Sequence, residues 1–87
     1  YGPGSWGSTT ACGVVLARNT LGLANRTLPC GTKVALYYHG KTMVVPVIDR
    51  GPYGDADWDL TQATAHQLGM ESAGRVTLGA VSLPARR

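Results

Sequence analysis

An acidic residue that follows a short apolar segment is the part of this sequence that could carry chemistry. Val47-Ile48 leads into Asp49, and Arg50 and the pair Gly51-Pro52 come directly after it. The apolar run predicts a strand, and Gly51-Pro52 predicts a turn at its end. A carboxylate at such a place can act as a general acid or base, or it can hold the turn by accepting backbone N–H bonds. Both interpretations of Asp49 stay open.

Other carboxylates and three aromatic residues could belong to the same site. Asp59 precedes Leu60-Thr61, where it could cap a helix, pair with an arginine or take part in the site. Asp55 and Asp57 have only faint metal-ligand spacing, so we expect no metal site and no cofactor. The aromatic residues could stack on sugar rings or fill the core of a chain without Phe. They are Trp6, Tyr53 and Trp58.

Length and composition predict one small folded domain over residues 1–87. Hydrophobic residues make up 44% of the chain and charged residues 15%, and twelve Gly and five Pro indicate many turns between short strands. The formal net charge of +3 favours contact with anionic polymers. Because the basic residues form no stripe with interleaved aromatics, we expect no nucleic-acid partner. We also expect a monomer.

The two cysteines, Cys12 and Cys30, each precede a glycine at a predicted bend. An even number in a small, Gly-rich chain favours a disulfide and an oxidising compartment, and two buried free thiols are the alternative. The longest apolar run, Met43–Ile48, is far too short to cross a bilayer. Since the chain begins at Tyr1-Gly2 without an initiator Met, we expect a piece of a longer secreted protein.

The clearest elements are two strands, Lys33–Tyr38 and Lys41–Ile48. They are joined by His39-Gly40, which predicts a tight hairpin turn with positive φ. Pro46 cannot donate to a sheet, so it predicts a bulge or an unpaired edge. A last strand is expected over Arg75–Leu83.

One helix is predicted over Thr61–Leu68. Asp59 or Thr61 would be its N-cap, and Gly69 would end it. Short strands, one brief helix and a disulfide together predict a small β-barrel.

Several short motifs occur along the chain in a fixed order, and a resemblance rests on them. They are Thr10-Ala11-Cys12-Gly13, Ala24–Val34, Val47–Tyr53, Asp59-Leu60-Thr61 and Leu68-Gly69-Met70. In this order they resemble the rare-lipoprotein-A-like double-psi β-barrel family, in its cysteine-paired form, and more remotely the barrels of expansins and barwin-like proteins. The resemblance implies a mainly β fold: a small six-stranded double-psi β-barrel, with one short α-helix and one disulfide.

The same resemblance implies a function at the cell envelope. Its partner would be peptidoglycan or a related polysaccharide, and its activity would be lytic transglycosylation. That reaction cleaves the bond between N-acetylmuramic acid and N-acetylglucosamine and leaves a 1,6-anhydro end. Asp49 matches the family's acid and would be the acid/base. Val14 and Asn25 stand where the family has Glu and His, so whether this chain is an enzyme stays open.

Seven further residues are expected to contact substrate around Asp49. They are Trp6, Thr10, Asn25, Arg50, Tyr53, Trp58 and Asp59. If the cation of Arg50 lies against Asp49, it opposes general-acid work by favouring the ionised carboxylate. Two alternatives to an enzyme follow: a glycan-binding or wall-loosening module of the expansin kind, and a protein-binding barrel such as a protease inhibitor.

Overall fold

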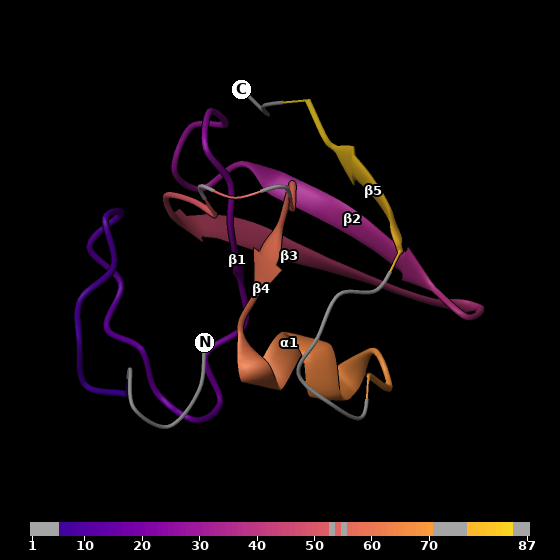
Figure 1. Cartoon of the computed structure of the whole chain (residues 1–87), viewed down its shortest axis with the longest axis horizontal. Helices are drawn as coiled ribbons and strands as arrows, with labels where there is room; N and C mark the ends of the chain where they lie inside the picture. Colours follow the sequence, from indigo (N-terminus) through magenta and orange to yellow (C-terminus); the bar gives the residue numbers. More distant parts are fainter. Residues whose placement is uncertain (1–5, 53, 55, 71–76, 85–87) are drawn as a thin grey trace.

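A curled sheet and one short helix make up the described part of the chain (Figure 1). The computed structural model describes residues 6–52, 54, 56–70 and 77–84. The elements are β1 (Leu23–Ala24), β2 (Lys33–Tyr38), β3 (Lys41–Asp49), β4 (Asp59–Leu60), α1 (Gln62–Gln67) and β5 (Gly79–Ser82). The sheet has the order β4-β1-β3-β2-β5, with β3 at its centre. The mainly β prediction with one short helix is confirmed.

The hairpin of β2 and β3 is the longest paired unit of the sheet. The two strands are antiparallel, and Tyr38 lies opposite Lys41 at the turn. His39 and Gly40 have φ values of 46° and 80°, as a two-residue turn of this kind requires. The predicted strands and turn are therefore confirmed, and β3 continues one residue beyond the prediction, to Asp49.

An irregularity near Pro46 shapes the end of β3. Pro46 lies within β3, which pairs with β2 on one edge and, in parallel, with β1 on the other. Leu23 of β1 lies opposite Val47, but the next residue of β1 lies opposite Asp49. Ile48 is thus an extra residue on β3, as in a β-bulge. The bulge predicted at Pro46 lies two residues further along the strand.

The caps of α1 follow from its sequence. Thr61 is the N-cap, and its hydroxyl accepts a bond from Thr64 N at 3.2 Å. The alternative cap Asp59 is wrong, because that residue lies in β4 and pairs with β1. The helix ends before its C-cap Leu68, and Gly69 follows with a φ of 85°, which a side chain would strain.

The core lies between the inner face of the sheet and α1. Its buried cluster is Leu23, Val34, Leu36, Val45, Val47 and Leu68. The predicted last strand is shorter than expected. Thr77 and Leu78 are outside any strand, and Arg75 lies outside the described residues. Within the described ranges, no helix has the length and apolar character needed to cross a membrane.

Gly22, just before β1, is a point of close approach. A Cβ at this position would lie 2.8 Å from Cδ1 of Ile48 and 2.9 Å from its Cγ1 and Cγ2. The backbone of Gly22 is also fixed, because its N–H donates to the Thr64 hydroxyl at 2.9 Å and its carbonyl accepts from the same hydroxyl at 3.1 Å. These bonds tie β1 to α1 and leave no room for a side chain.

We therefore expect Gly22→Ala to lower the free energy of unfolding by about 1–3 kcal/mol, the usual cost of overpacking a core. Urea-induced unfolding measures this change. In an Ile48→Ala background the clash is removed, so the cost of Gly22→Ala should fall. An equal cost in both backgrounds would contradict the close approach as its cause.

Candidate functional site

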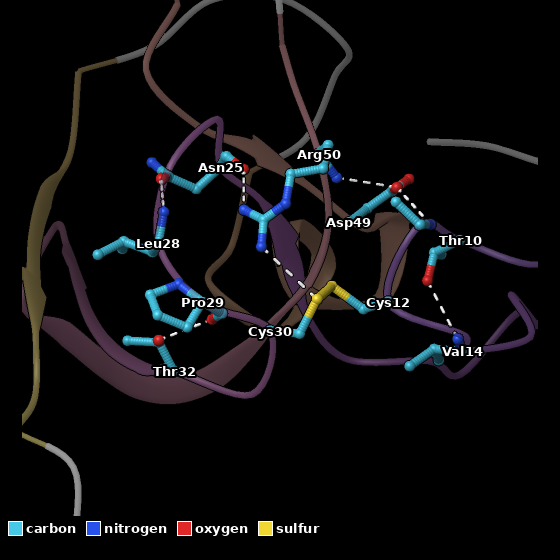
Figure 2. The surroundings of a disulfide bond; sticks show 11 residues. Thr10, Cys12, Val14, Asn25, Leu28, Pro29, Cys30, Thr32, Asp49 and Arg50 are labelled. Carbon is cyan, nitrogen blue, oxygen red and sulfur yellow. Dashed lines mark hydrogen bonds between the residues drawn. A yellow bond between two sulfur atoms is a disulfide. The ribbon is translucent and has the colours of Figure 1, made fainter.

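The candidate site lies where the C-terminal ends of β1 and β3 meet (Figure 2). Asn25 directly follows β1, and its backbone N–H donates to the carbonyl of Asp49 at 3.2 Å. Residues 10–14 approach the same place, because Cys12 N donates to the carbonyl of Ile48 at 3.3 Å. Residues far apart in the sequence are thus held around the last residue of β3.

Asp49 holds two of these segments together. Its Oδ1 accepts a bond from Ala11 N at 2.8 Å and another from Arg50 N at 2.9 Å. Backbone N–H donors stabilise the ionised form of a carboxylate. The interpretation of Asp49 as a residue that holds its turn is confirmed by these bonds. Its acid/base role stays a prediction.

Arg50 turns away from the carboxylate beside it. Its Nη1 donates to the backbone carbonyl of Asn25 at 2.8 Å, and its Nη2 lies 3.5 Å from Sγ of Cys30. In Figure 2 the guanidinium points toward Asn25 and Cys30, while the Asp49 side chain points to the opposite side. The guanidinium therefore does not lie against the Asp49 carboxylate, where it would oppose general-acid work.

The predicted disulfide is present between Cys12 and Cys30. It links two segments that both contact the end of β3, since Gly31 N donates to the carbonyl of Val47 at 2.8 Å. Cys12 neighbours Ala11, whose N–H bonds to Asp49. The disulfide consequently holds this donor in place beside the carboxylate.

Thr10 and Val14 close the loop that carries Cys12. Thr10 is buried, and its Oγ1 accepts a bond from Val14 N at 3.1 Å, while Thr10 N donates to the carbonyl of Val14 at 2.8 Å. The structure thus gives Thr10 a part in shaping the loop. Its contact with substrate stays a prediction.

Asn25 uses its side chain to hold the turn after β1. Its Oδ1 accepts from Thr27 N at 3.0 Å and from Leu28 N at 2.9 Å. Its Nδ2 donates to the carbonyl of Asp57 at 3.3 Å. An amide can serve as acceptor and donor at once, and these two uses connect the turn to the loop that precedes β4.

The aromatic residues and Asp59 are placed around other parts of the fold. Arg18 lies over the ring of Trp6, with its Cζ 5.2 Å from the ring centroid, so one face of this indole is covered. Trp58 is half-buried and packs against the core, as one of its two interpretations predicted. Asp59 is exposed in β4. Tyr53 lies outside the described residues.

Arg26, which was not among the predicted site residues, has three partners near the site. Its guanidinium bonds to the carbonyls of Pro52 and Ala56 and to the carboxylate of Asp57. Its place inside the motif Ala24–Val34 was the available signal. In the part of the chain that the structure describes, no three His, Cys, Asp or Glu residues gather as metal ligands would.

The chain is similar to proteins that are described as transglycosylases. A family model described as "Lytic transglycolase" matches residues 1–79. The chain is 42% identical over 77 residues to the "Probable endolytic peptidoglycan transglycosylase RlpA" of Synechocystis sp., a match that covers 85% of this chain and 24% of the relative. It is 34% identical over 86 residues to the "Endolytic peptidoglycan transglycosylase RlpA" of Yersinia pestis, with 95% and 24% covered.

One solved structure with a similar fold carries a different description. It is the "Streptomyces papain inhibitor (SPI)", which superposes with a TM-score of 0.58 at 30% identity. The match covers 71% of this chain and 69% of the inhibitor. The chain spans about a quarter of the length of the two curated relatives described above.

Removing the disulfide tests how strongly it holds the site together. The double variant Cys12→Ser/Cys30→Ser should lose about 3 kcal/mol of unfolding free energy, because the open chain regains the entropy that a loop of this length removes. Chemical denaturation measures the loss. A reductant should shift the wild-type midpoint to that of the variant and leave the variant unchanged. Equal midpoints for the oxidised wild type and the variant would show that the bond contributes nothing.

Proposed function

Because this chain belongs to the RlpA-like double-psi β-barrel family, we propose that it acts on the glycan strands of peptidoglycan at the end of β3. The predicted family and fold class are confirmed by the same matches. The observation that carries the proposal is the place of Asp49, where β1, β3 and the disulfide-linked loop meet. Its match to the family's acid is part of the proposal. A secreted or cell-envelope location is part of the proposal, and a disulfide agrees with it.

In the finer form of the proposal, Asp49 is the acid and base of lytic transglycosylation. The Asp49 carboxyl group carries the proton, and its Oδ1 accepts bonds from the backbone N–H groups of Ala11 and Arg50. The proton passes to the glycosidic oxygen as the bond from C1 of N-acetylmuramic acid to O4 of N-acetylglucosamine breaks. The C6 hydroxyl of the same muramic acid then attacks C1 and returns its proton to Asp49. The carboxyl group is restored, no water is consumed, and a 1,6-anhydro end forms.

One carboxyl group is enough for this reaction. Glycosidases that use water need a pair, one as acid and the other as base or nucleophile. Here the nucleophile belongs to the substrate, and the proton removed from it replaces the proton given to the leaving oxygen. The Arg50 guanidinium points toward Asn25 and Cys30 and does not lie against the Asp49 carboxylate. This placement supports the proposal.

A second candidate function is glycan binding without cleavage, and the residues at two positions favour it. Val14 replaces a Glu and Asn25 a His of the family pattern, and an amide cannot carry a proton near neutral pH. The side-chain oxygen of Asn25 already accepts bonds from its own turn. In this function Asp49 accepts hydrogen bonds from sugar hydroxyls. The likeness to a papain inhibitor makes protease binding the alternative if glycan is not bound.

Digestion of purified peptidoglycan, with mass spectrometry of the soluble products, tests the finer proposal. The wild type should release 1,6-anhydro-muramyl products, and Asp49→Asn should reduce their rate by about 10²–10⁴-fold, the usual contribution of an acid/base group. Asparagine is a matched control because its Oδ1 can still accept the bonds from Ala11 N and Arg50 N.

Sedimentation of the same two proteins with peptidoglycan separates the candidates. Release of anhydro products that is equal in both proteins would rule out Asp49 as the acid. Sedimentation without products would leave glycan binding alone. A wild type that neither cleaves nor sediments would contradict action on this glycan, and papain inhibition would then be measured.

Restoring the two missing groups tests whether they limit the rate. We expect Val14→Glu/Asn25→His to raise the rate of anhydro-product release by about tenfold or more, since each added group can take part in proton transfer. Circular dichroism must first show that the variant folds, because histidine loses the bonds that Asn25 makes to Thr27 and Leu28. No increase in a well-folded variant would show that these groups do not limit the reaction.

A further inference from the structure

Three residues between β3 and β4, namely Pro52, Ala56 and Asp57, are held by a residue that lies outside this segment. Arg26 Nη1 donates to the carbonyl of Pro52 at 2.8 Å and to the carbonyl of Ala56 at 2.7 Å. These two carbonyls are four residues apart in the sequence, and both accept a hydrogen bond from the same nitrogen. Nη2 donates to Oδ1 of Asp57 at 3.2 Å.

The residue before Arg26 adds a bond to the same loop. Asn25 Nδ2 donates to the carbonyl of Asp57, so two successive residues donate to three backbone carbonyls and one carboxylate. Asn25 is in turn connected to the candidate acid, because its N–H donates to the Asp49 carbonyl. The loop and the end of β3 are therefore held by the same short segment after β1.

The backbone bonds, rather than the ion pair, give this contact its strength. The side chains of Arg26 and Asp57 are 38% and 76% exposed, and ion pairs at such exposure contribute little. The guanidinium is a rigid planar group whose several donors are fixed relative to one another. It can therefore set the positions of Pro52 and Ala56, which a flexible ammonium holds less well.

We propose that Arg26 is a positioning residue for glycan binding: it holds the backbone at Pro52 and Ala56 and the side chain of Asp57, and these positions, which follow Asp49 in the chain, contact the glycan. This inference rests on the proposed function. Arg26 takes no part in the proton transfer. It acts by keeping Pro52, Ala56 and Asp57 in their binding positions before the glycan arrives, so that binding does not have to order these residues.

The test compares Arg26→Ala, Arg26→Lys and Lys33→Ala with the wild type. Amide hydrogen exchange of the loop peptide reports its order without any ligand, and sedimentation with purified peptidoglycan reports affinity. We expect Arg26→Ala to raise the exchange rate of the loop and to weaken binding about tenfold, and Arg26→Lys to restore part of both. Lys33 is exposed on β2, so Lys33→Ala removes the same charge and should change neither.

Asp57→Ala separates the ion pair from the backbone bonds. In Asp57→Ala the bonds from Arg26 to the carbonyls of Pro52 and Ala56 remain. The change in exchange rate and in affinity should therefore be smaller than in Arg26→Ala. An equal effect would overturn the assignment to the carbonyl bonds.

If the loop peptide of Arg26→Ala exchanges at the wild-type rate, the positioning role is overturned. If it exchanges faster but affinity for peptidoglycan is unchanged, the link between this role and glycan binding is overturned. If the wild type does not sediment with peptidoglycan, the proposed function fails and the link to glycan fails with it. The exchange rates still decide whether Arg26 positions the loop.

Discussion

The central position of β3 determines where every other part of the candidate site can lie. β3 is paired on both edges, antiparallel with β2 and parallel with β1, and the bulge at Ile48 turns its end. Asp49 is its last residue and lies opposite Ala24 of β1, so the pairing with β1 sets the direction of its side chain. The loop around Cys12 and the turn after β1 both attach to this end. A change in the pairing of β3 would displace all of them together.

Local sequence signals were sufficient to predict the elements that are defined by residues close together in the sequence. The β2–β3 hairpin has a turn that requires positive φ, and α1 has a threonine cap and a terminal glycine. β1 and β4 have two residues each, which is too short for any hydrophobic period to appear. They exist as strands only because β3 and β1 pair with them. Such pairing depends on tertiary contacts, so the sequence could not predict it.

The candidate site shows the same division between local and distant contacts. The position of Asp49 at a strand end followed from its neighbours in sequence, and the disulfide followed from an even number of cysteines in a small, Gly-rich chain. The role of Arg26 depends on backbone carbonyls about thirty residues away, which have no sequence signal of their own. The position of Asp59 just before the helix predicts a possible cap, but its pairing with β1 overrides that local preference.

Asn25 holds the shape of this site at the position where the resemblance implies a histidine. The amide accepts two bonds from its own turn and donates one to the loop before β4, which an imidazole with two ring nitrogens cannot reproduce in full. The hydrogen bonds that shape the site are therefore independent of proton transfer. Asp49 differs, because one carboxyl group both holds the loop at Ala11 and is the candidate acid. In the proposed function, cleavage therefore depends on what Asp49 does beyond its structural bonds.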